Sequence, residues 1–191
     1  MGYDVFITRN LEWYHAARCP IGLAEWRAVA ADLPWYPPAC VELPDGTALW
    51  YRAGAVSAKH PSDAAIAAML ALATALDAWV VGEELEVYTP DGPVEVPLPP
   101  AHRLAPVHAS DWPGVALRRP GFALSERTPA RLPSGVRWIA CPPVVLWSAS
   151  VPLHRDASDG SVELRTDDAA ALREAAALAA DLGATLTADG G

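Results

Sequence analysis

The stretches VSAKHPSDAAIAAMLALATALDAWVVGE at residues 56–83 and VELRTDDAAALREAAALAADLGATLTAD at residues 162–189 decide the fold of this chain. They align without a gap at a constant offset of 106 positions. Each contains an alternating strand, an acidic helix start, a helix and a closing strand. The apolar positions of both helices follow the i, i+3/i+4, i+7 spacing of an amphipathic helix with one buried face. The sequence therefore predicts one structural unit used twice.

The repeat extends backward if one loop is lengthened. Tyr51-Arg52 then aligns with His154-Arg155, and each unit becomes a hairpin, a helix and a strand. The alternative is a pair of unrelated segments with generic patterning, because most of the identical positions are alanines in an alanine-rich chain.

The N-terminal part has the element order βαββαβ. This order is ferredoxin-like and predicts an antiparallel sheet with two helices on one face. The fold class is therefore predicted as α+β, with a ferredoxin-like N-terminal unit and a degenerate ββαβ repeat packed as a pseudo-twofold pair. The predicted elements are strand 3–8, helix 23–31, hairpin 47–52 with 55–59, helix 62–76, strand 78–81 and hairpin 85–89 with 94–98.

Three parts are predicted along the chain. Residues 1–98 form the ferredoxin-like unit, residues 99–143 a Pro/Arg-rich connecting segment, and residues 144–191 the second hairpin–helix–strand unit. Prolines make long helices improbable in the connecting segment. Short strands are expected there at 115–117, 122–124 and 136–140, and no second copy of the first strand and helix is identified.

Composition bounds the class of protein. Of the 191 residues, 52% are hydrophobic, which is enough for a core. No apolar run approaches the roughly 18 residues that a membrane helix needs, and the start of the chain does not match a signal peptide. We therefore expect a cytoplasmic protein without a membrane partner. The three cysteines, Cys19, Cys40 and Cys141, have no metal-ligand or disulfide-framework spacing.

The net charge of −9 disfavours binding to a phosphate backbone, so no nucleic-acid partner is expected. Residues 101–155 nevertheless carry seven basic and two acidic side chains. These arginines could pair internally, bind an acidic protein surface or hold a small anion, for which a guanidinium is well shaped. The anion-binding candidates are Arg118, Arg119, Arg52 and Arg155.

No motif for a nucleotide, a metal or a catalytic nucleophile is present. The five histidines lack the spacing that places two imidazoles on one metal. We therefore predict no catalytic residue, no metal and no cofactor, although an enzyme without a recognisable motif stays open.

Seven of the eight tryptophans fall into two groups, and the eighth, Trp26, lies on the apolar face of the predicted helix 23–31. Those in predicted strands, Trp50, Trp79, Trp138 and Trp147, are expected in the core. Aromatic residues in predicted loops are candidates for a protein interface, because such interfaces are enriched in exposed aromatics. The interface candidates are Trp13, Trp35, Tyr36 and Trp112.

Two functional hypotheses follow. The first is a non-catalytic protein-binding module, such as an immunity or regulatory protein, whose acidic surface would speed capture of a basic partner. The second is a protein that binds a small anionic ligand, or an unrecognised enzyme, with a site between the two repeats. Its pocket candidates are Tyr51, Arg52, His154 and Arg155.

An ordered and spaced set of residues lies between about residues 3 and 88. It comprises Tyr3-Asp4, Ile7-Thr8-Arg9, Trp13, Pro20-Ile21, Glu25-Trp26, Trp50, Gly54, Val56, Lys59, Pro61, Met69, Ala73, Leu76 and Ala78. In these positions the chain resembles an uncharacterised family of small bacterial proteins. The resemblance implies an α+β domain and supplies no activity. If the family has a shared polar site, the matching positions here are Tyr3, Asp4, Arg9 and Lys59; His60 departs from the pattern.

Overall fold

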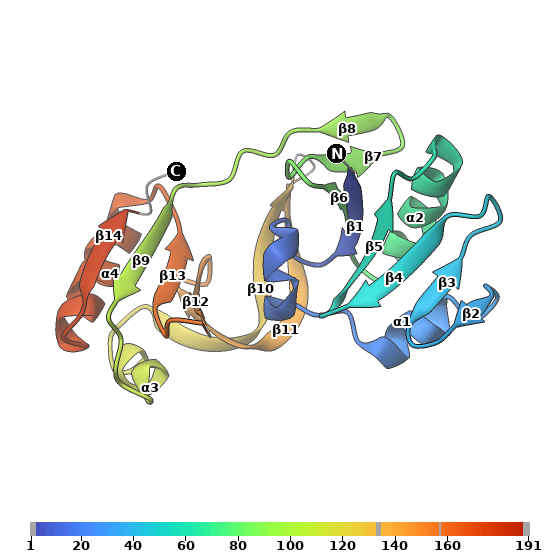
Figure 1. Cartoon of the computed structure of the whole chain (residues 1–191). Helices are drawn as coiled ribbons and strands as arrows, with labels where there is room; N and C mark the ends of the chain where they lie inside the picture. Colours follow the sequence, from blue (N-terminus) through green and yellow to red (C-terminus); the bar gives the residue numbers. More distant parts are fainter. Residues whose placement is uncertain (1–2, 133–134, 157, 189–191) are drawn as a thin grey trace. The chain divides into compact units, whose positions relative to one another are not determined.

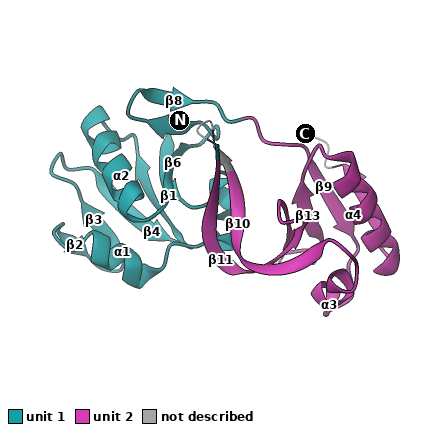
Figure 2. Cartoon of the chain, turned by 180° about the vertical axis from the view of Figure 1, so that it is seen from behind, with its two compact units in different colours: residues 1–96, 132–135 teal, residues 97–131, 136–191 magenta. Residues whose placement is uncertain are grey.

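A computed structural model describes residues 3–132, 135–156 and 158–188 of the chain. It is an α+β structure with two antiparallel sheets, as the predicted fold class requires. The chain divides into two compact units, coloured separately in Figure 2. Unit 1 comprises residues 1–96 and 132–135, and unit 2 comprises residues 97–131 and 136–191. No helix within the described residues is long and apolar enough to cross a membrane.

Unit 1 is built on an eight-stranded antiparallel sheet (Figure 1). Its strand order is β2-β3-β4-β5-β1-β6-β7-β8, so the first strand of the chain lies inside the sheet. The strands are β1 (Asp4–Thr8), β2 (Trp35–Tyr36), β3 (Cys40–Glu42), β4 (Ala48–Arg52), β5 (Ala55–Lys59), β6 (Trp79–Gly82), β7 (Val87–Thr89) and β8 (Gly92–Val94).

Two α-helices cover one face of this sheet, α1 (Leu23–Val29) and α2 (Asp63–Ala75). A 3-10 helix, η1 (Trp13–Arg18), precedes α1. The buried stripe of α2 and the alternate residues of β1, β4 and β5 share one hydrophobic core. The largest side chain of that core is Trp26 on α1, which is fully buried. This burial of apolar area is the main stabilising contribution to the unit.

Unit 2 has a six-stranded sheet in the order β10-β11-β12-β13-β9-β14. Helices α3 (Trp112–Leu117) and α4 (Ala169–Asp181) contribute to its separate hydrophobic core. The strands are β9 (Ala101–Ala105), β10 (Phe122–Leu132), β11 (Gly135–Trp147), β12 (Val151–Arg155), β13 (Val162–Arg165) and β14 (Thr185–Ala188).

The two sheets share the strand order of their central strands. In unit 1 this order is β4-β5-β1-β6, and in unit 2 it is β12-β13-β9-β14. In chain order, a helix follows the first of these four strands, which is β1 in unit 1 and β9 in unit 2. Another helix follows the third, which is β5 in unit 1 and β13 in unit 2. The bounds of α4 and β14 lie 106 positions after those of α2 and β6. The positions that β1 and α1 hold in unit 1 are thus held in unit 2 by β9 and α3.

The long helices of the two units also end in the same way. The amide of Ala78 donates to the carbonyl of Ala73 at 2.9 Å, and that of Ala184 donates to Ala179 at 2.8 Å. The residue after each C-cap has positive φ, which is 53° at Asp77 and 65° at Gly183. A left-handed residue here closes a helix by satisfying its last carbonyls.

The connecting segment predicted at residues 99–143 contains regular elements that the sequence does not signal. The strand expected at residues 115–117 is wrong, because these residues belong to α3, where Asp111 accepts a hydrogen bond from the amide of Gly114 at 3.2 Å. The strand β9 was not predicted. It is paired on both sides, by β13 and β14, so its conformation comes from the sheet and not from local propensity.

Local sequence signals did predict a hairpin turn and a helix start in unit 1. The hairpin across Ala53-Gly54 is confirmed by the pairing of Arg52 with Ala55. The sequence allows either Ser62 or Asp63 as the N-cap of α2. In the structure the cap is Ser62, whose hydroxyl oxygen accepts from the amide of Ala65 at 3.0 Å. Trp35 and Tyr36, which were expected in a loop, form the short strand β2, which pairs with β3.

A first prediction concerns this N-cap. The Ser62 hydroxyl also donates to Asp45, and this hydrogen bond, with that from the amide of Thr47, lowers the pKa of the Asp45 carboxyl. Ser62→Ala is expected to raise that pKa towards its ordinary value and to cost about 1 kcal/mol of stability through the lost cap. A pKa lowered by folding stabilises the protein above the unfolded-state pKa, and this contribution is lost as pH falls through the folded-state pKa.

An NMR titration of the carboxyl groups measures this effect. The pKa of Asp159, which is lowered chiefly by the hydroxyl and amide of Ser161, is the internal control and should not move. An unchanged Asp45 pKa in Ser62→Ala would contradict the assignment.

Candidate functional site

One face of the unit 1 sheet carries a row of directly opposed residues. Tyr36 on β2 is opposite Cys40 on β3, which is opposite Trp50 on β4, and the row continues through Ser57 on β5 to Phe6 on β1. Directly opposed residues of an antiparallel sheet lie on the same face. The neighbouring residues in the strands point to the other face, where the helices and the core lie.

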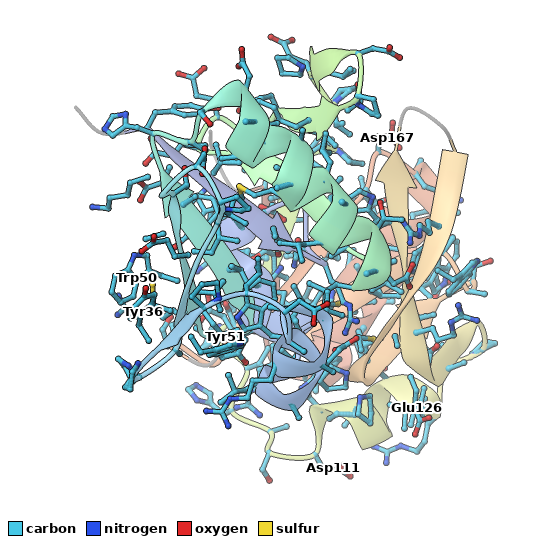
Figure 3. The ribbon with its side chains drawn as sticks, turned by 90° about the vertical axis from the view of Figure 1, so that its right-hand side faces the viewer. Tyr36, Trp50, Tyr51, Asp111, Glu126 and Asp167 are labelled. Carbon is cyan, nitrogen blue, oxygen red and sulfur yellow. The ribbon has the colours of Figure 1, made fainter. Side chains whose placement is uncertain are left out.

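Two aromatic side chains stand out from this row. Tyr36 is 49% exposed and Trp50 is 50% exposed, and Cys40 between them is buried. Figure 3 shows Tyr36 and Trp50 on the same side of the sheet. The prediction that Trp50 lies in the core is therefore wrong; Trp138, at 37% exposed, also departs from it. We call Tyr36 and Trp50 the aromatic surface.

Charged residues of both signs surround the aromatic surface. Glu42 on β3, Arg52 on β4 and Lys59 on β5 are exposed, and each lies an even number of residues from a member of the row. They therefore share its face. An apolar centre with a mixed charged rim is the composition typical of protein interfaces.

Trp13 lies over the far end of the row. Its ring stacks on Phe6 with the centroids 4.3 Å apart and the planes 1° from parallel. Its indole N–H donates to the carbonyl of Glu83 at 3.4 Å. Trp13 is half-buried, so it shields Phe6 and presents only part of its ring.

The other two interface candidates pack within their units. Trp35 donates its indole N–H to the carbonyl of Ala30 at 3.1 Å. The centroids of the Trp35 and Trp26 rings are 6.3 Å apart, and Cζ of Arg27 lies 5.5 Å from the centroid of Trp35. Trp112 is only 5% exposed and belongs to the core of unit 2. Of the four predicted residues, Tyr36 is thus the one with a largely exposed ring.

The corresponding row of unit 2 is charged. His154, Glu163, Arg103 and Thr187 are opposed across β12, β13, β9 and β14. Glu163 lies 106 positions after Ser57 of the unit 1 row, and Thr187 lies 106 positions after Val81, the residue on β6 opposite Phe6. The same sheet position is therefore aromatic in one unit and ionic in the other.

Ion pairs run along this charged row. Arg103 binds Asp159 at 2.7 Å, and Arg165 Nε lies 3.9 Å from Glu163 Oε1. Glu163 is buried, with a side chain only 5% exposed. A buried carboxylate is stable only with such partners.

The strand pairing also corrects the equivalence between hairpins. His154 is the partner of Glu163, and Trp50 is the partner of Ser57, so His154 corresponds to Trp50 and not to Tyr51. A shift of one residue moves a side chain to the other face of a sheet. Tyr51 accordingly points to the helix side, where its hydroxyl donates to the carbonyl of Ile21 at 2.9 Å.

The remaining pocket candidates, Arg52 and Arg155, are both exposed. Arg52 belongs to β4 of unit 1 and Arg155 to β12 of unit 2. Convergence of the four pocket candidates on one ligand stays a prediction.

Arg118 and Arg119 follow α3 and differ in their surroundings. Arg119 binds Asp181 at 2.6 Å and Glu174 at 3.1 Å, and these two carboxylates raise its pKa. Arg118 is exposed, and the described part of the chain shows no ion pair for it. The two arginines line a depression of about 480 Å³ together with Val115, Pro120 and Asp181.

The positions of the family resemblance have structural partners in unit 1. Arg9 forms an ion pair with Glu25 and donates to the carbonyls of Leu76 and Pro20. Tyr3 and Tyr88 share a hydrogen bond of 3.0 Å between their hydroxyls. Asp4 and Lys59 are directly opposed across β1 and β5.

The three thiols are not paired with each other. Cys19 and Cys40 are buried, and Cys141 is half-buried. Burial, with the nearby Glu42 carboxylate, raises the pKa of the Cys40 thiol. A raised pKa keeps Cys40 protonated and poorly nucleophilic.

No family model, curated protein or solved structure matches this chain.

Proposed function

We propose that this protein is a non-catalytic protein-binding module that binds its partner through the aromatic surface. The observation that carries the proposal is the pair of half-exposed rings, Tyr36 and Trp50, in one row of the sheet face opposite α1 and α2. Trp and Tyr dominate the binding energy of protein interfaces because they bury a large area at a small entropic cost.

The charges support the same proposal. Glu42, Arg52 and Lys59 form a rim in which both signs are present, so a partner can be oriented as well as held. The net charge of −9 accelerates encounter with a basic partner. An immunity or regulatory role in the cytoplasm stays a more specific prediction, which the identity of a captured partner tests.

We also propose that each unit is a ferredoxin-like domain and that the two arose by duplication. The shared central strand order and the helices after the first and third strands support this. Three buried positions of α2, at Ala65, Met69 and Ala73, also lie 106 positions before buried residues of α4, at Ala171, Ala175 and Ala179. The hairpin β10–β11 is then an insertion between the first helix and the second central strand of unit 2.

Trp50→Ala is expected to weaken partner binding at least about tenfold, because removal of a central aromatic residue from an interface costs about 2 kcal/mol or more. Its effect on the free energy of unfolding should stay within about 0.5 kcal/mol, since the ring is half exposed. The measurement is affinity capture from lysate of the source organism with quantitative mass spectrometry, comparing the variant with the unchanged chain.

Trp138→Ala provides the matched control, because it removes an exposed tryptophan from β11 of unit 2. A partner that is lost with Trp50→Ala and with Tyr36→Ala, and kept with Trp138→Ala, supports the proposal. Equal capture by all three variants would place the partner elsewhere on the chain.

A second candidate function is binding of a small charged ligand. It is favoured by one observation, the exposed Arg118 at the rim of a surface depression.

A further inference from the structure

A depression lies where α3 meets the end of α4 in unit 2. It has a volume of about 480 Å³ and is lined by Val115, Arg118, Arg119, Pro120 and Asp181. Small-molecule sites have volumes of roughly 300–1,000 Å³ and combine apolar walls with a few polar groups. Val115 and Pro120 provide apolar walls, and the three ionic side chains provide the polar groups. We call it the α3 depression.

The ionic groups are not all available to a ligand. The Arg119 guanidinium is held by Asp181 Oδ2 and by Glu174, so it serves mainly to position Asp181. Asp181 Oδ1 accepts no hydrogen bond within the described residues, and the side chain is 48% exposed. Arg118 is exposed and forms no ion pair there. A ligand therefore meets one free guanidinium and one free carboxylate oxygen.

These charges are not part of the shared scaffold. The residues 106 positions before Glu174 and Asp181 are Ala68 and Ala75, and α2 forms with both. Asp181 is also the last residue of α4, where a negative charge opposes the helix dipole at a cost of about 0.3–1 kcal/mol. The ion pair with Arg119 offsets this cost through only one of the two carboxylate oxygens, Oδ2. The other oxygen, Oδ1, stays available to a ligand.

We propose that the α3 depression binds a small zwitterion of the α-amino acid type. Its carboxylate binds the Arg118 guanidinium, its ammonium binds Asp181 Oδ1, and an aliphatic side chain lies against Val115 and Pro120. A zwitterion is favoured over phosphate because the charges of Arg118, Arg119, Glu174 and Asp181 sum to zero. An anion alone would meet repulsion from the two carboxylates. The α3 depression belongs to unit 2 and the aromatic surface to unit 1. The inference rests on the second candidate function, ligand binding, and does not depend on partner binding by the aromatic surface.

The test is a titration of the full-length protein followed by its amide NMR spectrum. The probe is L-leucine, with N-acetyl-L-leucine as a ligand that lacks the ammonium and isopentylamine as one that lacks the carboxylate. We expect saturable shifts at the amides of Val115, Arg118 and Arg119 with leucine. The two fragments should bind at least about tenfold more weakly, because each lacks one charged hydrogen bond.

Two substitutions complete the test. Arg118→Gln is expected to raise the Kd for leucine about tenfold, and the exposed Arg173→Gln on α4, outside the depression, should leave the Kd unchanged. The amide spectrum of each variant reports directly whether it remains folded. Three outcomes would overturn the proposal: no saturable shifts, equal binding of N-acetyl-L-leucine and leucine, or an unchanged Kd in folded Arg118→Gln.

Discussion

Replacing Gly54 with alanine is expected to destabilise unit 1 by about 3 kcal/mol. This sum contains the cost of placing a side chain on a left-handed backbone and the cost of a steric clash. Gly54 is the second residue of the two-residue turn between β4 and β5, and its φ is +86°. An L-residue with a side chain is disfavoured there by about 1–2 kcal/mol. Glycine is therefore the residue that this hairpin turn requires.

The clash accounts for the rest of the expected effect. A Cβ at Gly54 would lie 2.6 Å from the Cβ of Pro20 and 2.9 Å from its Cα. The backbone cannot simply move away, because the carbonyl of Gly54 accepts a hydrogen bond from the amide of Ile21 at 2.9 Å. This contact fixes the start of α1 against the hairpin. Gly54→Ala must therefore displace either the turn or the α1 entry.

Gly46→Ala separates the two contributions. Gly46 has a φ of +87°, and no atom lies within 4 Å of a Cβ added there. Its substitution should cost only the backbone contribution of about 1 kcal/mol. The measurement is urea denaturation followed through the amides of unit 1. Equal costs for the two substitutions would show that the approach of Pro20 is not a tight contact.

Arg9→Met is expected to cost about 3 kcal/mol, through loss of a buried network of charge-assisted hydrogen bonds. Arg9 directly follows β1, and its side chain is only 11% exposed. Its Nε and Nη2 atoms donate to the carbonyl of Leu76 at 3.0 and 2.6 Å, and Nη1 donates to Pro20 at 3.3 Å. Leu76 is the C-cap of α2, so one side chain joins the sheet to both α-helical segments of the unit.

Methionine retains most of the aliphatic volume, so the comparison isolates the hydrogen bonds. The carbonyls of Leu76 and Pro20 would then lose their donor, which is costly for buried groups. Glu25→Gln is the control, because it removes the charge of the ion pair and leaves the carbonyl bonds of Arg9 in place. It should cost no more than about 1 kcal/mol, since Glu25 is exposed. Urea denaturation measures the free energy of unfolding of both variants. A larger loss for Glu25→Gln than for Arg9→Met would contradict the assignment of the stabilisation to the carbonyl hydrogen bonds of Arg9.

Local sequence patterns were sufficient for the elements whose stabilisation is local. Helix α2 and its Ser62 N-cap follow from the apolar period and the cap preference. The turn at Ala53-Gly54 follows from the short loop between two alternating runs. Tyr36 was an interface candidate because it is an aromatic residue in a predicted loop. Its exposure supports that interpretation.

The candidate sites depended on information that is not local. Trp50 lies in an alternating strand, and the pattern cannot tell which of the two faces carries the helices. The register of β3, β4 and β5 places Trp50 beside Tyr36 and turns the adjacent Tyr51 to the helix side. Likewise, Arg119 could be separated from Arg118 only once α3 lay against α4 and brought Asp181 to it.

The sequence by itself determined the α+β class, the two long amphipathic helices and their 106-residue spacing, because each depends on contacts between residues close in the chain. The tertiary structure decided that β9 is a strand and that the same sheet row is aromatic in unit 1 and charged in unit 2. These features depend on pairing between distant strands. Cross-strand neighbours are fixed by register and not by sequence separation, and it is they that give Trp50 and His154 their surroundings.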